Sequence, residues 1–150
     1  MKISNLTNEN LINLQLKGKD KIEIIKELAS LMEKENKLIS SAQYLQDVYK
    51  REDEYSTAFE RGIAIPHGKS HGVRESCIAI GKCNKVKWSH EDNCPVEIVI
   101  LMAVPKDKAN DEHLAILSKL AEMLMEDEFI EELKKAATSN EVLNMLKNIN

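Results

Sequence analysis

The chain has 150 residues, of which 43% are hydrophobic and 31% charged, and its formal net charge at pH 7 is −4. We predict a single domain over residues 1–150, because the length suits one domain and no Pro/Gly/Ser-rich linker divides it. No basic run interleaves with aromatic residues, which excludes the charge pattern of a nucleic-acid-binding protein. We expect a cytoplasmic protein, because no segment resembles a signal peptide or a membrane span.

The first part of the chain is predicted to form one strand and two helices. Residues 11–16 alternate between apolar and polar side chains, which is the period of a half-buried strand. Capping boxes begin helices at Asp20 and Ser40, since Glu23 and Gln43 follow three positions later. The apolar positions of the second helix continue to about Lys50, and the segment that follows, REDEYSTAFERG, is predicted to be a loop.

The pattern then changes to strands and, after these, to helices. Three short runs are suited to strands: residues 63–65, 76–80 and 85–88. The continuous apolar run 98–104 predicts a central strand buried on both faces. A helix capped by Asn110 or Asp111 follows, and two more are predicted over roughly 127–136 and from Thr138. This order predicts an α/β fold, a single layered domain in which helices flank a mixed β-sheet.

Two histidines are predicted to lie beyond the ends of strands. Pro66 lacks an N–H and keeps Ile65 extended, so the chain is expected to turn out of its strand just before His67. His113 lies in the first turn of the helix after strand 98–104, where free N–H groups and the helix dipole favour an anion. Open α/β sheets bind ligands outside the carboxyl ends of their strands, so the two histidines can meet there.

The residues around His67 favour a reactive role for its imidazole over a structural or exposed one. A lone histidine in a turn is more often a structural or exposed residue, but Gly62 and Gly68 lack Cβ atoms and let other backbone or a bulky ligand approach closely. A neutral imidazole is a nucleophile near pH 7 when a partner keeps one ring nitrogen protonated. Phosphoryl transfer suits such a group, and Arg51 and Arg61 are candidate donors to the phosphoryl oxygens. We expect no metal and no cofactor, because glycines interrupt the spacing of a helical zinc site.

The segment REDEYSTAFERGIAIPHGKSHGV resembles the phosphorylation segment of a known protein family. The family comprises the enzyme IIA domains of the bacterial phosphoenolpyruvate sugar phosphotransferase system (PTS), fructose/mannitol class. The matching residues, in order, are Arg51, Glu52, Ser56, Thr57, Gly62, Ala64, Pro66 and His67. A second similar segment, EDNCPVEIVILMAVP followed by EHLAILSKLA, contains His113. The chain departs from the family's usual Ser-Thr-Gly-x-Gly-Asn-Gly at Ala58, Glu60 and Arg61.

The resemblance implies a phosphotransferase that works through a phosphohistidine. His67 matches the phosphorylated histidine, which takes the phosphoryl group from the phosphocarrier protein HPr and passes it to a cysteine of enzyme IIB. His113 matches a second histidine that hydrogen-bonds the phosphoryl group, Arg51 matches an arginine near the site, and Thr57 is implied as a loop anchor. The implied partners are therefore HPr and enzyme IIB. A membrane component IIC is reached only through IIB, and nucleic acid is not expected.

Two functions of this family remain open, and a third class is less favoured. The first is a phosphocarrier for sugar uptake. The second is a nitrogen-type regulatory enzyme IIA, which carries phosphate on the same histidine but signals by binding target proteins. A non-catalytic interaction domain is the third, and the presence of both His67 and His113 counts against it.

Overall fold

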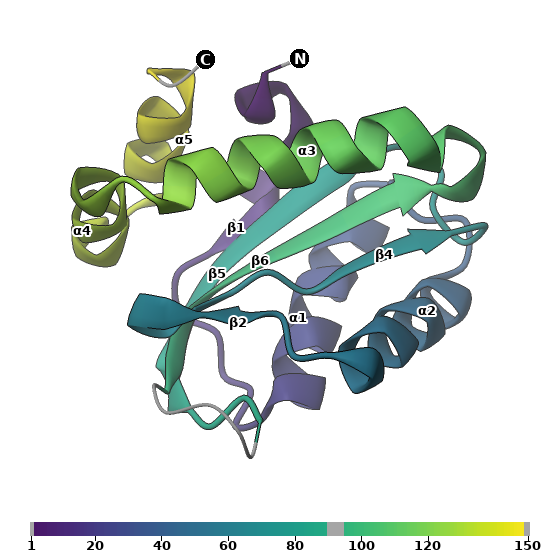
Figure 1. Ribbon diagram of the computed structural model, residues 1–150, viewed down its shortest axis with the longest axis horizontal. Coiled ribbons are helices and arrows are strands. Elements are labelled where there is room, and N and C mark those ends of the chain that lie inside the picture. The colour runs from purple at the N-terminus through teal and green to yellow at the C-terminus, as the bar shows by residue number, and fades with distance from the viewer. Residues whose placement is uncertain (1, 90–94, 149–150) are drawn as a thin grey trace.

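The computed structural model describes residues 2–89 and 95–148 of the chain. Within these residues the chain forms an open, mixed sheet of six strands with helices on both faces (Figure 1). This architecture confirms the predicted α/β layered fold. The first four residues of the EDNCPVEIVILMAVP segment lie outside the described residues.

The sequence divides between strands and helices as follows. The strands are β1 (Ile12–Asn13), β2 (Ala58–Phe59), β3 (Ile63–Ala64), β4 (His67–Ser70), β5 (Cys77–Val86) and β6 (Val96–Pro105). The α-helices are α1 (Lys21–Lys34), α2 (Ser41–Glu54), α3 (Ala109–Leu124), α4 (Asp127–Lys135) and α5 (Ser139–Lys147). No helix of the described residues has both the length and the apolar character needed to cross a membrane.

Strand β6 lies at the centre of the sheet, whose order is β1-β5-β6-β3-β2. It pairs antiparallel with β5 on one side. On the other side β3 and β4 follow one another along the same edge, both parallel to β6. Consecutive side chains of β6 alternate between the two faces, and both faces are buried, as the continuous apolar run predicted.

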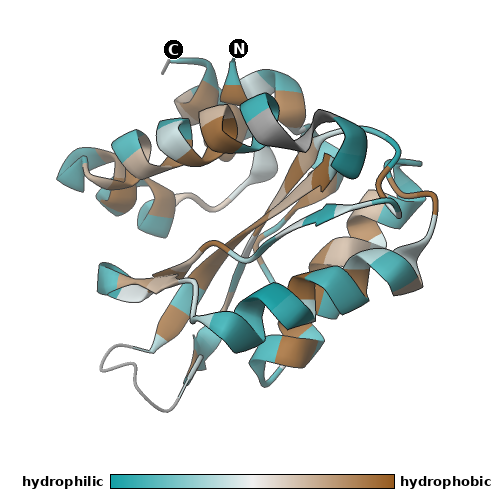
Figure 2. Cartoon of the chain, turned by 45° about the vertical axis from the view of Figure 1, so that its right-hand side comes forward, coloured by the Kyte–Doolittle hydropathy of each residue, from teal (hydrophilic) through white to brown (hydrophobic). Residues whose placement is uncertain are grey.

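Each face of the sheet has its own apolar core. Ile98, Ile100 and Met102 of β6 pack with residues of α3, α4 and α5, whereas Val99 and Leu101 pack with residues of α1 and α2. Figure 1 shows α3 crossing one face and α1 and α2 covering the other, and in Figure 2 hydrophobic residues concentrate between these layers. The two cores hold the helices firmly against the sheet, so the helix ends are fixed relative to the strand ends.

The predicted helix caps explain where three of the helices begin. The side chains of Asp20, Ser40 and Thr138 each accept a hydrogen bond from the backbone N–H three residues on, at 2.9, 3.1 and 3.2 Å. Such a cap satisfies one of the free N–H groups at a helix start and stabilises the helix by about 1 kcal/mol. The prediction of these three starts is confirmed.

Three predicted boundaries at the strands and at α3 were wrong. Residues 11–16 contribute only the two residues of β1, because Leu11 belongs to a 3-10 turn and the chain bends after Asn13, whose side chain accepts from the N–H of Gln15. The runs 76–80 and 85–88 belong to one strand, β5, because the backbone ladder continues through polar residues whose side chains are partly exposed. Helix α3 already begins at Ala109, directly after a 3-10 turn, so Asn110 and Asp111 lie inside the helix rather than capping it.

The predicted loop from Arg51 was also partly wrong. Helix α2 continues to Glu54, because Arg-Glu-Asp-Glu contains good helix formers and neither glycine nor proline to stop it. Arg51 and Glu52 therefore lie in the last turn of a rigid helix. Farther along the same segment, Ala58 and Phe59 form β2, which pairs antiparallel with β3.

Candidate active site

His67 is the first residue of β4 and is only 7% exposed. Its Nδ1 lies 3.0 Å from the carbonyl oxygen of Ile65. A carbonyl oxygen only accepts hydrogen bonds, so Nδ1 carries the proton and Nε2 is the basic nitrogen of the ring. The structure thus supplies the partner that a nucleophilic imidazole requires.

The backbone around His67 differs from the predicted turn. Ile65 and Pro66 interrupt the ladder between β3 and β4, because proline has no N–H to donate. Pairing with β6 then resumes at once, His67 opposite Met102, and the N–H of Met102 donates to the carbonyl of Pro66 at 3.0 Å. His67 is therefore held in a strand beside the centre of the sheet and not in an open turn.

The structure brings His113 next to His67. The centroids of the two rings lie 5.3 Å apart and their planes are inclined by 48°. The short connection from the end of β6 to α3 places His113 in the early part of that helix, above the start of β4. Nε2 of His113 is buried and has no hydrogen-bond partner among the described residues. The pair therefore offers a second ring nitrogen that a group bound at His67 can engage.

Both imidazoles are neutral at pH 7. Burial lowers the pKa of His67 below its ordinary value, although the bond to Ile65 acts in the opposite direction. Burial also lowers the pKa of His113 to about 4, and the neighbouring His67, Lys69 and Arg51 add to this effect. A neutral ring keeps the lone pair on one nitrogen, so His67 is in the form that can attack phosphorus.

The lowered pKa of His113 predicts a loss of stability in acid. Between pH 6.5 and about 4 the unfolded chain binds a proton that the folded chain resists, so the free energy of unfolding should fall as the pH decreases through this window. His67 acts in the same direction. Urea unfolding of wild type and His113→Gln at several pH values across the window measures this effect. An equally steep fall in His113→Gln would contradict it.

A hollow of about 440 Å³ opens beside the two rings. It is lined by Asp47, Lys50, Arg51, Glu54, His67, Gly68, Lys69 and His113. Four of these residues lie along one face of α2, so the extension of this helix to Glu54 builds one wall of the hollow. Three cations and two carboxylates give the lining a small positive excess, which suits a small anion.

Arg51 links this hollow to a second one. Its Nη1 donates to the carbonyl oxygen of Tyr55 at 2.7 Å, which holds the guanidinium beside the end of α2. Arg51 and His67 also line a hollow of about 240 Å³ together with Thr57, Phe59 and others. Arg51 and His67 thus line both hollows together.

Glu52 is a residue of this region to which the sequence pattern gave no role. Glu52 is 4% exposed, and its carboxylate accepts hydrogen bonds from Thr57, one from the backbone N–H at 3.0 Å and one from the hydroxyl group. These bonds hold the segment after α2 against the helix. The signal in the sequence is a Glu followed five positions later by a Thr, which is too common to have identified the pair.

The two glycines around His67 make room for the chain itself. A Cβ on Gly68 would lie 2.8 Å from a methyl carbon of Val48 and 3.2 Å from the ring of Tyr44, both on α2. Gly62 has a φ of +82°, and a Cβ there would lie 3.0 Å from the carbonyl oxygen of Pro95. The glycines were expected to let either other backbone or a bulky ligand approach closely. The structure shows the first of these, close packing of the chain's own elements.

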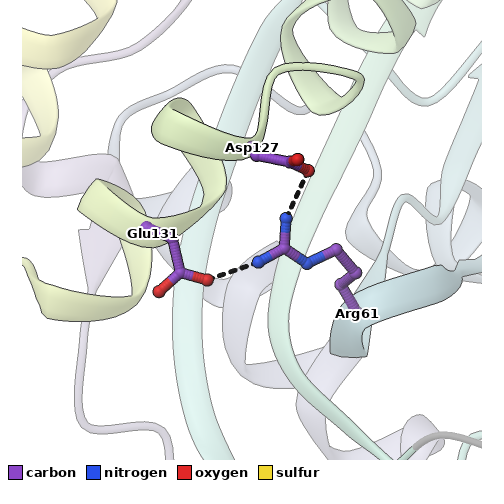
Figure 3. A network of polar contacts seen from close by, with 3 residues as sticks. All are labelled: Arg61, Asp127 and Glu131. Atoms are coloured by element: carbon purple, nitrogen blue, oxygen red, sulfur yellow. Dashed lines mark hydrogen bonds and ion pairs between the residues drawn. The ribbon is translucent and has the colours of Figure 1, made fainter.

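Arg61 does not line the hollow that contains both histidines. Its guanidinium points to α4, where one nitrogen lies 2.6 Å from Asp127 and the other pairs with Glu131 (Figure 3). Of the two candidate donors, Arg61 is therefore directed to α4, and Arg51 is the one that lines the hollow. The loop between β2 and β3 turns Arg61 away from His67 and toward α4 instead.

Arg61 also adopts a left-handed conformation, with φ +69°, which costs a residue with a side chain about 1 kcal/mol. Asparagine tolerates this conformation better than alanine does. Both Arg61→Ala and Arg61→Asn lose the exposed ion pairs, which contribute little. We therefore expect Arg61→Ala to be less stable than Arg61→Asn by about 1 kcal/mol in urea unfolding. Equal stabilities would show that the backbone is not strained here.

The chain is an open α/β domain that holds a histidine, protonated on Nδ1, beside a second imidazole in a hollow whose lining has a small positive excess. The sequence matches the family described as "Phosphoenolpyruvate-dependent sugar phosphotransferase system, EIIA 2" over residues 5–149. The chain therefore belongs to the type-2 enzyme IIA family of this phosphotransferase system, as the two motifs indicated.

Individual relatives agree with this assignment. The PTS system 2-O-alpha-mannosyl-D-glycerate-specific EIIABC component of Escherichia coli (strain K12) is 30% identical over 148 residues, which is 97% of this chain. The chain spans only 22% of that relative's own length. The crystal structure of nitrogen regulatory protein IIA-Ntr from Neisseria meningitidis is 30% identical with a TM-score of 0.86, over 96% of this chain and 98% of that one.

A second similar structure shows the fold alone. It is the complex of enzyme IIAMTL and phosphorylated enzyme IIBMTL from Escherichia coli, which is 23% identical to this chain with a TM-score of 0.80. The likeness covers 95% of this chain and 97% of that one. The layered sheet with helices on both faces is therefore common to sugar-specific and nitrogen-regulatory domains.

Proposed function

We propose that the chain is a cytoplasmic phosphocarrier for sugar uptake, in which His67 accepts a phosphoryl group from phospho-HPr and passes it to a cysteine of enzyme IIB. The observation that supports this most directly is the bond between Nδ1 of His67 and the carbonyl of Ile65. It leaves Nε2 as the basic nitrogen of a ring that lines a cationic hollow.

The transfer needs no further reagent. The lone pair of Nε2 attacks phosphorus, a nitrogen–phosphorus bond forms on His67, and the bond between phosphorus and HPr breaks. In the second step a cysteine thiolate of enzyme IIB attacks phosphorus and the bond to His67 breaks. Arg51 and His113 are the groups we assign to the phosphoryl oxygens, because both flank His67. Thr57 holds the adjoining segment in place through Glu52.

A regulatory function of the nitrogen type is the second candidate. The similarity to IIA-Ntr from Neisseria meningitidis favours it, since the identity equals that of the sugar-specific relative. Such a protein accepts phosphate on the same histidine but acts by binding target proteins. The presence of genes for enzymes IIB and IIC beside that of this chain would favour sugar uptake, whereas a sigma-factor neighbourhood would favour regulation.

A reconstituted transfer tests the proposal. The protein is incubated with phosphoenolpyruvate, enzyme I and HPr, and its intact mass is measured. We expect a gain of about 80 Da, the mass of one phosphoryl group, and its loss when a fructose- or mannitol-class enzyme IIB is added. Omission of HPr should prevent the gain. A protein that gains no mass in the complete mixture would not be a phosphocarrier, and one that gains mass but never passes it on would fit the regulatory candidate.

A further inference from the structure

We propose that Glu52 is a positioning residue for His67, acting through a chain of hydrogen bonds that ends at the imidazole. The inference rests on the proposed function only in taking His67 as the reacting group. The chain has three links: from Glu52 to Thr57, from Thr57 to Ile65, and from Ile65 to His67.

The first link is a buried carboxylate that helix stability does not explain. Glu52 lies in the last turn of α2, where the negative end of the helix dipole disfavours an acidic side chain. Removing a carboxylate from water is also costly unless it is hydrogen-bonded. Here both oxygens accept hydrogen bonds from Thr57, one from the N–H and one from the hydroxyl, and such charge-assisted bonds are strong. Thr57 is thereby fixed at two atoms.

The second and third links carry this constraint to the imidazole. The carbonyl of Thr57 accepts a hydrogen bond from the N–H of Ile65 at 3.0 Å, and the carbonyl of Ile65 accepts one from Nδ1 of His67 at 3.0 Å. Ile65 lies between β3 and β4, where pairing with β6 is interrupted, and its bond to Thr57 extends the β2–β3 register by one pair. The bond from Thr57 therefore helps to set the direction in which the carbonyl of Ile65 faces the ring.

The negative charge of Glu52 also acts directly on the imidazole of His67. It raises the pKa of His67, against the larger lowering by burial. A ring that forms a bond to phosphorus through Nε2 while Nδ1 stays protonated becomes more positive, and a nearby carboxylate stabilises that state. Glu52 thus favours the more positive ring that forms when Nε2 is bonded to phosphorus and Nδ1 stays protonated.

The structure offers a control carboxylate with the same kind of bonds. Glu27 on α1 accepts hydrogen bonds from the backbone N–H groups of Lys17 and Gly18 and so anchors another segment after another strand. None of these bonds leads toward His67. Loss of Glu27 therefore reports what the removal of a loop-anchoring carboxylate does by itself.

The test measures which ring nitrogen of His67 carries the proton, by NMR of protein with ¹⁵N-labelled histidine and without any phosphoryl donor. In wild type we expect the proton on Nδ1. Glu52→Ala should increase the population protonated on Nε2 and reduce the rate of phosphoryl acceptance from phospho-HPr about tenfold. Glu52→Gln keeps one oxygen acceptor but loses the charge, so it should shift the tautomer less than Glu52→Ala while lowering the pKa of His67 further.

Two comparisons decide the outcome. Glu27→Ala should leave the His67 signals as in wild type, and Thr57→Ser, which keeps both donors to Glu52, should do the same. If Glu52→Ala does not fold, Thr57→Val removes only the hydroxyl bond and should shift the tautomer in the same direction. An unchanged tautomer in folded Glu52→Ala, or in Thr57→Val where Glu52→Ala does not fold, would overturn the proposal, and so would an equal change in Glu27→Ala. Since the tautomer is measured without a donor, a protein that HPr does not phosphorylate can still confirm or refute this role.

Discussion

The His67→Ala variant is expected to gain no mass from phosphoenolpyruvate, enzyme I and HPr, whereas wild type gains one phosphoryl group. Alanine removes the basic Nε2, and His113, whose Nε2 is buried, does not take over as the acceptor. Intact-mass measurement over a time course gives the rate for each variant. Because alanine at position 67 leaves the backbone pairing with Met102 possible, the fold should persist, which circular dichroism checks.

His71→Ala is the matched control for this experiment. His71 lies four positions farther along and is exposed, so the same substitution there should leave phosphorylation at the wild-type rate. An equal gain of mass in His67→Ala would remove His67 from the mechanism. A loss of phosphorylation in His71→Ala would show that the surface beyond β4, and not the nucleophile, limits the reaction.

The second large effect is expected at His113. Its ring lies 5.3 Å from that of His67, and its pKa of about 4 keeps it neutral before phosphate arrives. The negative charge of a phosphoryl group on His67 favours a proton on His113, which lets this ring donate a hydrogen bond to a phosphoryl oxygen. His113→Ala should therefore still accept phosphate from HPr but pass it to enzyme IIB about 10²-fold more slowly, the usual effect of removing one such donor.

Rapid-quench measurement of the two half-reactions separates acceptance from onward transfer. His113→Gln keeps a side-chain donor and should recover part of the onward rate that His113→Ala loses. Wild-type rates in both half-reactions of His113→Ala would exclude His113 from the transfer. Equal losses in both variants would mean that the imidazole itself, and not a hydrogen-bond donor, is required.

Those candidate site residues could be predicted from the sequence whose role is indicated by their immediate neighbours in the chain. Pro66, which ends an apolar strand pattern, and the flanking glycines pointed to His67. The helix start after a buried strand pointed to His113. Arg51 was identified as a candidate but was expected in a loop, because the apolar stripe of α2 ends before the helix does. Arg61 was as plausible as Arg51 by residue type, and only the path of the loop between β2 and β3, which leads to α4, separates them.

The sequence by itself determined the α/β class, the central buried strand and the capped helices, because each depends on periodicity or on bonds between near neighbours, and it identified the two histidines as candidates. The tertiary structure alone decided the bonds of Glu52, the wall that α2 forms beside His67 and the direction of Arg61. These depend on how α2, α4 and the sheet pack together, and contacts between residues distant in sequence leave no local pattern. The histidine was visible in the sequence, but the groups that orient it became visible only in the folded chain.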